Sequence, residues 1–181
     1  MKGQTSNVLI TGKPGSGKTT LMKALAGRWR HCRPIGFFTE EIRRRGHREG
    51  FRIESWDGKK GLLASISLDS PLRVGRYRIA VEQLDAMVTH LRSLPVQPNS
   101  LFLVDEIGKM ESYSALFRQW IEELLELANP LVATISLAAH PWIEKIRTRA
   151  DVELLTIQPR HWQPVLHQVD TWLKETIDTQ N

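Results

Sequence analysis

Residues 12–19 have the residue types and spacing of a loop that binds phosphate. The pattern G-x-x-x-x-G-K-T supplies glycines that let the backbone wrap round an anion, followed by a lysine and a hydroxyl. Lys18 is expected to hold the β- and γ-phosphates of a nucleoside triphosphate during catalysis, and Thr19 to ligate Mg²⁺. We therefore predict a nucleotide-binding loop made by Gly12, Lys13, Pro14, Gly15, Ser16, Gly17, Lys18, Thr19 and Thr20.

A second set of reactive side chains follows a continuous apolar run at residues 101–104. Asp105 at the end of this run is predicted to ligate Mg²⁺ and to contact the nucleotide site. Glu106 is expected to activate or orient a water in line with the γ-phosphorus, which favours hydrolysis. The simpler interpretation, two exposed acids that end a strand, takes no account of the phosphate loop upstream.

The elements that must position these residues can be predicted from periodicity. An apolar run before the loop and helix-forming residues after it give the strand–loop–helix setting that a phosphate loop requires. The helix adds its positive dipole end and unpaired N–H groups. We expect strands at 7–11, 36–42, 49–56, 61–66, 101–104, 131–135 and 152–157, and helices at 18–30, 82–94, 112–128, 141–149 and 162–177.

This order predicts an α/β fold of the P-loop NTPase class, with a mainly parallel sheet flanked by helices. Residues 36–80 are rich in predicted strands and are expected to form an antiparallel insertion on that plan. Ligands of such a sheet bind at the carboxyl ends of its strands. At 181 residues the chain is expected to be one domain.

Composition narrows the classes of protein further. A hydrophobic content of 41% and a charged content of 25% are typical of globular proteins. Cys32 is the single cysteine, which excludes an intrachain disulfide framework and a multi-cysteine metal site. No apolar run is long enough to span a bilayer and no secretory signal is evident, so we expect a cytoplasmic protein without a membrane partner. The net charge of +5 suits an anionic ligand; nucleic acid is a less favoured partner than nucleotide.

The chain resembles the nucleoside-triphosphatase family of small P-loop proteins. The resemblance rests on residues 12–19, Gly-Phe-Phe-Thr-Glu-Glu-Ile-Arg at 36–43, Gly-Phe at 50–51, Val-Gly-Arg-Tyr at 74–77, Asp-Glu-Ile-Gly-Lys-Met-Glu at 105–111 and Ala-Thr-Ile at 133–135. It implies a monomeric, RecA-like fold and Mg²⁺-dependent hydrolysis of ATP, GTP, CTP and UTP to diphosphate and phosphate. The family tends to have Asn-Arg-Asp after its last strand, whereas this chain has Gln-Pro-Arg-His at 158–161.

Several further side chains are candidates for contact with the triphosphate. Arg43 belongs to the family-like stretch and is the preferred arginine finger among Arg43, Arg44, Arg45 and Arg48, although a solvated basic turn is the simpler interpretation. Arg76 is comparable. Thr134 ends the strand after the acidic one and is expected to sense the γ-phosphate. Lys109 and Glu111 are close enough in sequence to reach the site as a pair.

Two other functions are compatible with the same motifs. A small-molecule or nucleoside kinase would pass the phosphoryl group to an acceptor, and residues 43–48 would be its candidate lid. A nucleotide-controlled switch protein would bind a partner or RNA and turn over slowly. Phosphate release without an acceptor separates hydrolysis from the first of these, and stimulation by a partner would favour the second.

Overall fold

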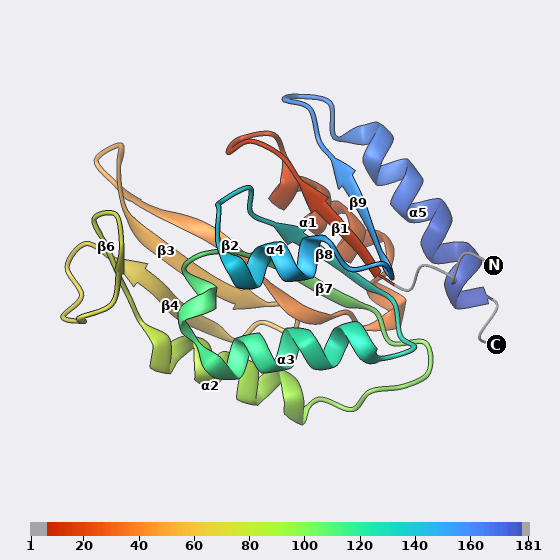
Figure 1. The fold of residues 1–181 in the computed structure, drawn as a ribbon, viewed down its shortest axis with the longest axis horizontal. Helices are drawn as coiled ribbons and strands as arrows, with labels where there is room; N and C mark the ends of the chain where they lie inside the picture. Colours follow the sequence, from red (N-terminus) through yellow and green to blue (C-terminus); the bar gives the residue numbers. More distant parts are fainter. Residues whose placement is uncertain (1–6, 179–181) are drawn as a thin grey trace.

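A nine-stranded sheet forms the centre of the computed structural model, which describes residues 7–178 (Figure 1). The strand order in the sheet is β5-β6-β4-β3-β2-β7-β8-β1-β9. The strands are β1 (Asn7–Thr11), β2 (Ile35–Arg44), β3 (His47–Ser55), β4 (Lys60–Ser65), β5 (Arg73–Val74), β6 (Tyr77–Ile79), β7 (Phe102–Ile107), β8 (Leu131–Ile135) and β9 (Val152–Thr156).

The sheet has a parallel half and an antiparallel half that share β2. Strands β2, β7, β8, β1 and β9 pair in parallel, and β8 lies between β1 and β7. Strands β3, β4, β6 and β5 continue the sheet from β2 with antiparallel pairings. The acidic strand β7 is therefore two places from the strand that leads into the phosphate loop.

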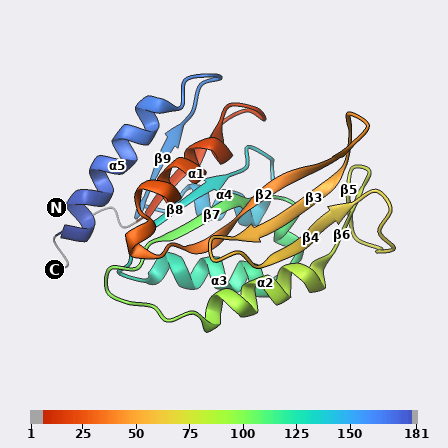
Figure 2. The same ribbon diagram turned by 180° about the vertical axis from the view of Figure 1, so that it is seen from behind.

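Helices cover both faces of the parallel half (Figures 1 and 2). Helices α2, α3 and α4 pack on one face, and α1 and α5 on the other. Because both faces are covered, β1 and β8 are buried along their whole length. The helices are α1 (Lys18–Arg28), α2 (Val81–Ser93), α3 (Ala115–Glu126), α4 (Pro141–Arg147) and α5 (Gln163–Asp178), with short 3₁₀ turns η1 (Arg30–Cys32) and η2 (Glu111–Tyr113).

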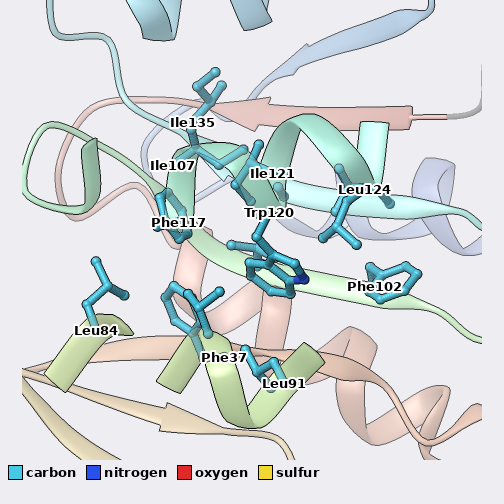
Figure 3. Close-up of a cluster of buried hydrophobic side chains, with 14 of the residues drawn as sticks. Phe37, Leu84, Leu91, Phe102, Ile107, Phe117, Trp120, Ile121, Leu124 and Ile135 are labelled. Atoms are coloured by element: carbon cyan, nitrogen blue, oxygen red, sulfur yellow. The ribbon is translucent and has the colours of Figure 1, made fainter. Parts of the chain in front are cut away.

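The core beneath α2 and α3 is rich in aromatic side chains (Figure 3). Phe37 of β2 lies 6.0 Å from Phe117 and 6.5 Å from Trp120, measured between ring centroids. Leu84 and Leu91 of α2 are buried in the same cluster. This packing fixes β2 and β7 against the helices, so the ends of both strands are held in place.

Most predicted elements agree with the structure to within about two residues, and the differences have local causes. Strand β7 continues through Asp105 and Glu106 to Ile107, with an irregular register against β8 after Val104. Helix α3 begins later than predicted because the Ser114 hydroxyl caps it, accepting a hydrogen bond from the Phe117 amide at 2.8 Å. Between residues 7 and 178, no helix is long and apolar enough to cross a membrane.

Candidate functional site

A cleft of about 600 Å³ opens at the carboxyl ends of the parallel strands. The phosphate loop and the start of α1 form one wall, and the segment after β8 forms another. The antiparallel half contributes Thr39, Glu40 and Glu41 from β2, and Arg48 and Phe51 from β3. Asp105 and Glu106 lie in the lining, so the structure brings both predicted acids to the predicted loop.

The phosphate loop connects β1 to α1 in the conformation that its glycines allow. Gly15 (φ 77°) and Gly17 (φ 103°) both adopt the left-handed region. A Cβ atom on Gly17 would lie 2.8 Å from Cδ1 of Trp162, so the loop also packs closely against the start of the last helical segment. The Ser16 hydroxyl is buried with no hydrogen-bond partner in the described part of the chain, as expected of a loop shaped for an anion.

Lys18 lies over this loop at the first position of α1. Its ammonium group donates to the carbonyl of Gly12 at 2.9 Å and to that of Lys13 at 3.3 Å. No side chain caps the N-terminus of α1. The amide groups of the first helical turn and the Lys18 charge therefore face the same cleft, which is an arrangement suited to phosphate.

Asp105 is held between two hydroxyl groups. The Thr19 hydroxyl donates to Oδ2 and the Thr134 hydroxyl donates to Oδ1, each at 2.6 Å. Burial raises the pKa of the Asp105 carboxyl, against the opposing effects of these hydroxyls and of the Lys18 charge. The two hydrogen bonds orient the carboxylate, so that Thr19 and Asp105 present oxygen atoms at one point of the cleft.

This donor set fits a divalent cation that binds oxygen. Mg²⁺ takes one or two protein oxygens and completes its octahedron with water and substrate phosphates. Among residues 7–178 there is no cluster of three histidine, cysteine or acidic side chains able to hold a metal without such help. The Thr19–Asp105 pair therefore has the composition expected where a metal arrives together with a nucleotide.

Thr134 lies near the end of β8, as predicted, but not in the lining of the cleft. Its side chain is fully buried and is absent from the cleft lining, because the Thr134 hydroxyl is used by Asp105. Thr134 thus acts on the cleft through Asp105. Thr134 lies on the same face of β8 as Val132, which packs with α1, but its hydroxyl is taken up by Asp105, and the sequence does not reveal that contact.

Glu106 has a different environment from its neighbour. It lines the cleft, and no side-chain hydrogen bond or ion pair ties it to another described residue. Burial raises the pKa of the Glu106 carboxyl, and the negative charge of Asp105 raises it further. A carboxylate that is partly desolvated and free of protein partners can accept a proton from a water molecule.

Glu111 is a third carboxyl group behind the acidic pair. Burial, followed by the charge of Glu106, raises the pKa of Glu111 to about 8. Gly108 makes room for it, since a Cβ atom on Gly108 would lie 2.7 Å from Glu111 Oε2 and 3.5 Å from Glu106 Cδ. Lys109 is exposed and makes no ion pair with Glu111, so the predicted pairing is wrong.

The arginine nearest the cleft is Arg48. Arg43, the preferred candidate from the sequence, donates to the Glu41 carboxylate at 2.7 Å and to the Gly46 carbonyl at 3.2 Å, and it does not line the cleft. Arg48 lines it, and its guanidinium lies 3.0 Å from the same Glu41 carboxylate. Arg76 donates to the Arg48 carbonyl at 2.7 Å and thereby supports the strand that carries Arg48.

Several cleft residues were not predicted from the sequence. Thr39 and Phe51 lie within the family-like stretches at 36–43 and 50–51 but were not assigned to the site, and Ser136 to Ala138 carry no motif. Their signal is positional: Ser136 to Ala138 directly follow β8, and Thr39 lies on the strand beside β7. Once the strand order is known, these residues can be predicted to line the site, because ligands bind at the carboxyl edge of such a sheet.

Comparisons with known proteins find a family model and similar chains that cover most of this one. A family model described as NTPase matches residues 7–170. Nucleoside-triphosphatase THEP1 of Thermotoga sp. (strain RQ2) is 38% identical over 167 residues, which cover 92% of this chain and 95% of that protein. The protein of the same name from Methanocaldococcus jannaschii is 30% identical over 171 residues, covering 92% and 99%.

Two solved structures are similar as well. The crystal structure of THEP1 from Aquifex aeolicus has a TM-score of 0.82 and 33% identity, and the match covers 93% of this chain and 99% of that one. The solution structure of a human cancer-related nucleoside triphosphatase has a TM-score of 0.79 and 29% identity, covering 93% and 97%.

Proposed function

The chain belongs to the NTPase family and is a nucleoside-triphosphatase, and we propose that it hydrolyses ATP, GTP, CTP and UTP to the diphosphate and phosphate with Mg²⁺. The breadth of substrates follows from the resemblance to this family, and the cleft residues named above are suited to phosphate and Mg²⁺, which all four nucleotides share. The observation that supports hydrolysis is the placement of Glu106 in the cleft lining, where its carboxyl group makes no hydrogen bond or ion pair with another side chain of residues 7–178.

The phosphate loop would hold the triphosphate. Backbone N–H groups of residues 15–19 would contact its oxygens, and the Lys18 ammonium would move from the loop carbonyls to the β- and γ-phosphates. Thr19 and Asp105 would hold Mg²⁺, which neutralises charge on the β- and γ-phosphate oxygens when bound. Thr134 would keep Asp105 in the orientation that this role requires.

Glu106 would act on the attacking water. It accepts a proton from that water as the water oxygen bonds to the γ-phosphorus, and the bond from phosphorus to the β–γ bridging oxygen breaks. The products are inorganic phosphate and the nucleoside diphosphate, whose bridging oxygen takes the departing electron pair. Arg48 is the proposed cation for the charge that develops on this oxygen, with Arg43 as the second candidate.

The test is phosphate release from ATP, GTP, CTP and UTP, measured with and without Mg²⁺ and without any acceptor molecule. We expect release from all four in Mg²⁺ and loss of release in EDTA. Phosphate transfer that needs an added metabolite, with none released to water, would identify a kinase and refute hydrolysis. Slow release that a partner or RNA raises sharply would favour a switch protein.

A further inference from the structure

A second cavity, of about 420 Å³, lies away from the phosphate cleft. The two cavities share no lining residue. Helix α1 begins at the cleft with Lys18 and contributes Ala26 to the second cavity. Strand β2 contributes Ile35, at its start, to the second cavity and Thr39 to the cleft. The second cavity therefore lies at the opposite end of α1 and β2. We call it the indole pocket, after Trp56.

Trp56 is held rigidly in the wall of the indole pocket. Its indole N–H donates to the Leu103 carbonyl at 2.8 Å, and its backbone N–H donates to the Gly36 carbonyl at 3.1 Å. Phe38 lies against the indole with ring centroids 4.9 Å apart. Gly36 (φ 141°) is required here, because a Cβ atom would lie 1.9 Å from the Leu103 carbonyl oxygen that Trp56 uses. An aromatic surface fixed in this way can stack a planar ligand without losing side-chain freedom.

Two arginines whose side chains have no hydrogen-bond or ion-pair partner within residues 7–178 share this pocket with Trp56. Neither Arg30 nor Arg33 makes a side-chain hydrogen bond or ion pair to another described residue, and both are exposed. By contrast, Arg28 in the last turn of α1 forms an ion pair with Asp170, with 3.5 Å between Nη1 and Oδ2. The carboxylate in the pocket lining, Asp57, is engaged by the Ser55 hydroxyl and by His90 Nε2 at 2.8 Å.

We propose that the indole pocket binds a small anion that carries a planar aromatic group, such as an aromatic sulfonate, carboxylate or phosphate ester. Arg30 and Arg33 bind the anionic group through charge-assisted hydrogen bonds, and the ring packs against Trp56. The volume fits one ligand of this size. Binding does not require the nucleotide site, since the two cavities have separate linings.

The probe for this proposal is 8-anilinonaphthalene-1-sulfonate, added to the full chain without nucleotide. Binding is followed by its fluorescence and by the ¹H–¹⁵N signal of the Trp56 indole, which Trp56→Phe identifies among the tryptophan signals. We expect one saturable site with its largest shift at Trp56. Arg30→Ala and Arg33→Ala should each weaken binding about fivefold, and the double variant about twentyfold.

Three controls decide the outcome. Arg44→Ala removes an exposed arginine outside the pocket and should leave probe affinity unchanged. Lys18→Ala should also leave it unchanged, and loss of binding in that variant would place the probe in the phosphate cleft and overturn the proposal. Uncharged N-phenyl-1-naphthylamine should bind at least about fivefold more weakly. Equal affinity for the uncharged probe, or unchanged affinity in the arginine variants, would also overturn it.

Discussion

The two halves of the sheet contribute to the phosphate cleft in different ways. The parallel half supplies groups whose positions are fixed by burial, as when two threonine hydroxyls hold Asp105. The antiparallel half supplies the exposed Glu41 and the half-buried Arg48, which are held together by an ion pair near solvent. Exposed ion pairs contribute little to stability and rearrange readily. We infer that the parallel half fixes the positions of the triphosphate, the metal and the water. The antiparallel half supplies a movable cation that stabilises charge on the leaving oxygen.

The largest effect should come from the fixed phosphate loop. Lys18→Ala removes the cation expected at the β- and γ-phosphates and should lower kcat/KM by about a thousandfold or more. Lys13→Ala is the matched control, because Lys13 is an exposed lysine of the same loop, and it should change kcat/KM by less than about threefold. Phosphate release under matched conditions measures both. Equal losses in the two variants would contradict the distinction between fixed and exposed charges.

The next largest loss of activity is expected at Asp105, the carboxylate in the parallel half of the sheet. Asp105→Asn keeps the shape of the side chain but removes its charge, so we expect about a hundredfold loss of activity and a higher Mg²⁺ requirement. Thr134→Val removes one of the two hydroxyls that orient Asp105 and should cost about tenfold, mainly through the Mg²⁺ requirement. Mg²⁺ titrations of phosphate release give both values. Normal Mg²⁺ dependence in Asp105→Asn would refute its role.

Substitution of arginines in the antiparallel half should lower kcat by smaller factors, and Arg48 and Arg43 should differ from each other. Arg48→Ala should lower kcat by about ten- to a hundredfold, because Arg48 lines the cleft and its ion pair with Glu41, which lies near solvent, can rearrange so that Arg48 contacts the leaving oxygen. Arg43→Ala should change kcat by less than about threefold, because Arg43 is bound to Glu41 and Gly46 away from the lining. Steady-state kinetics on the two variants measure the difference. The reverse order would restore Arg43 as the finger.

The remaining prediction concerns stability in place of activity, and it comes from Glu111. Its pKa is about 8 in the folded chain and about 4.5 in the unfolded one, so the folded state binds the extra proton between these values. The protonated Glu111 carboxyl makes its full contribution to the free energy of unfolding below pH 4.5, and this contribution is lost as the pH rises through 8. Glu111→Gln cannot titrate, and its Tm should therefore rise relative to wild type between pH 5 and 8, by an amount equivalent to a few kcal/mol at most.

Glu82→Gln is the control for this comparison, because Glu82 is exposed on α2. Its Tm should follow that of wild type at every pH. A constant difference between Glu111→Gln and wild type across this range would show that Glu111 is ionised throughout and would contradict its burial as a neutral acid.

Local motifs and buried strands could be predicted from the sequence because their causes are local. The phosphate loop is encoded by consecutive residues, and the apolar run at 101–104 predicted the strand that brings Asp105 to it. The absence of Arg43 from the cleft lining could not be predicted, because the register between β2 and β3 shifts at Ile42 and Arg43 and periodicity does not reveal such an irregularity. Glu111 was not recognised as buried because charged side chains are usually exposed.

The most direct test of the account is the single-turnover rate of Glu106→Gln with ATP and Mg²⁺ bound. Glutamine keeps the size of the side chain but cannot accept the proton of the attacking water. We predict ATP affinity within about threefold of wild type and a rate of phosphate formation about a hundred- to ten-thousandfold lower. A variant that binds ATP and hydrolyses it at the wild-type rate would contradict the assignment of Glu106 as the residue that activates water.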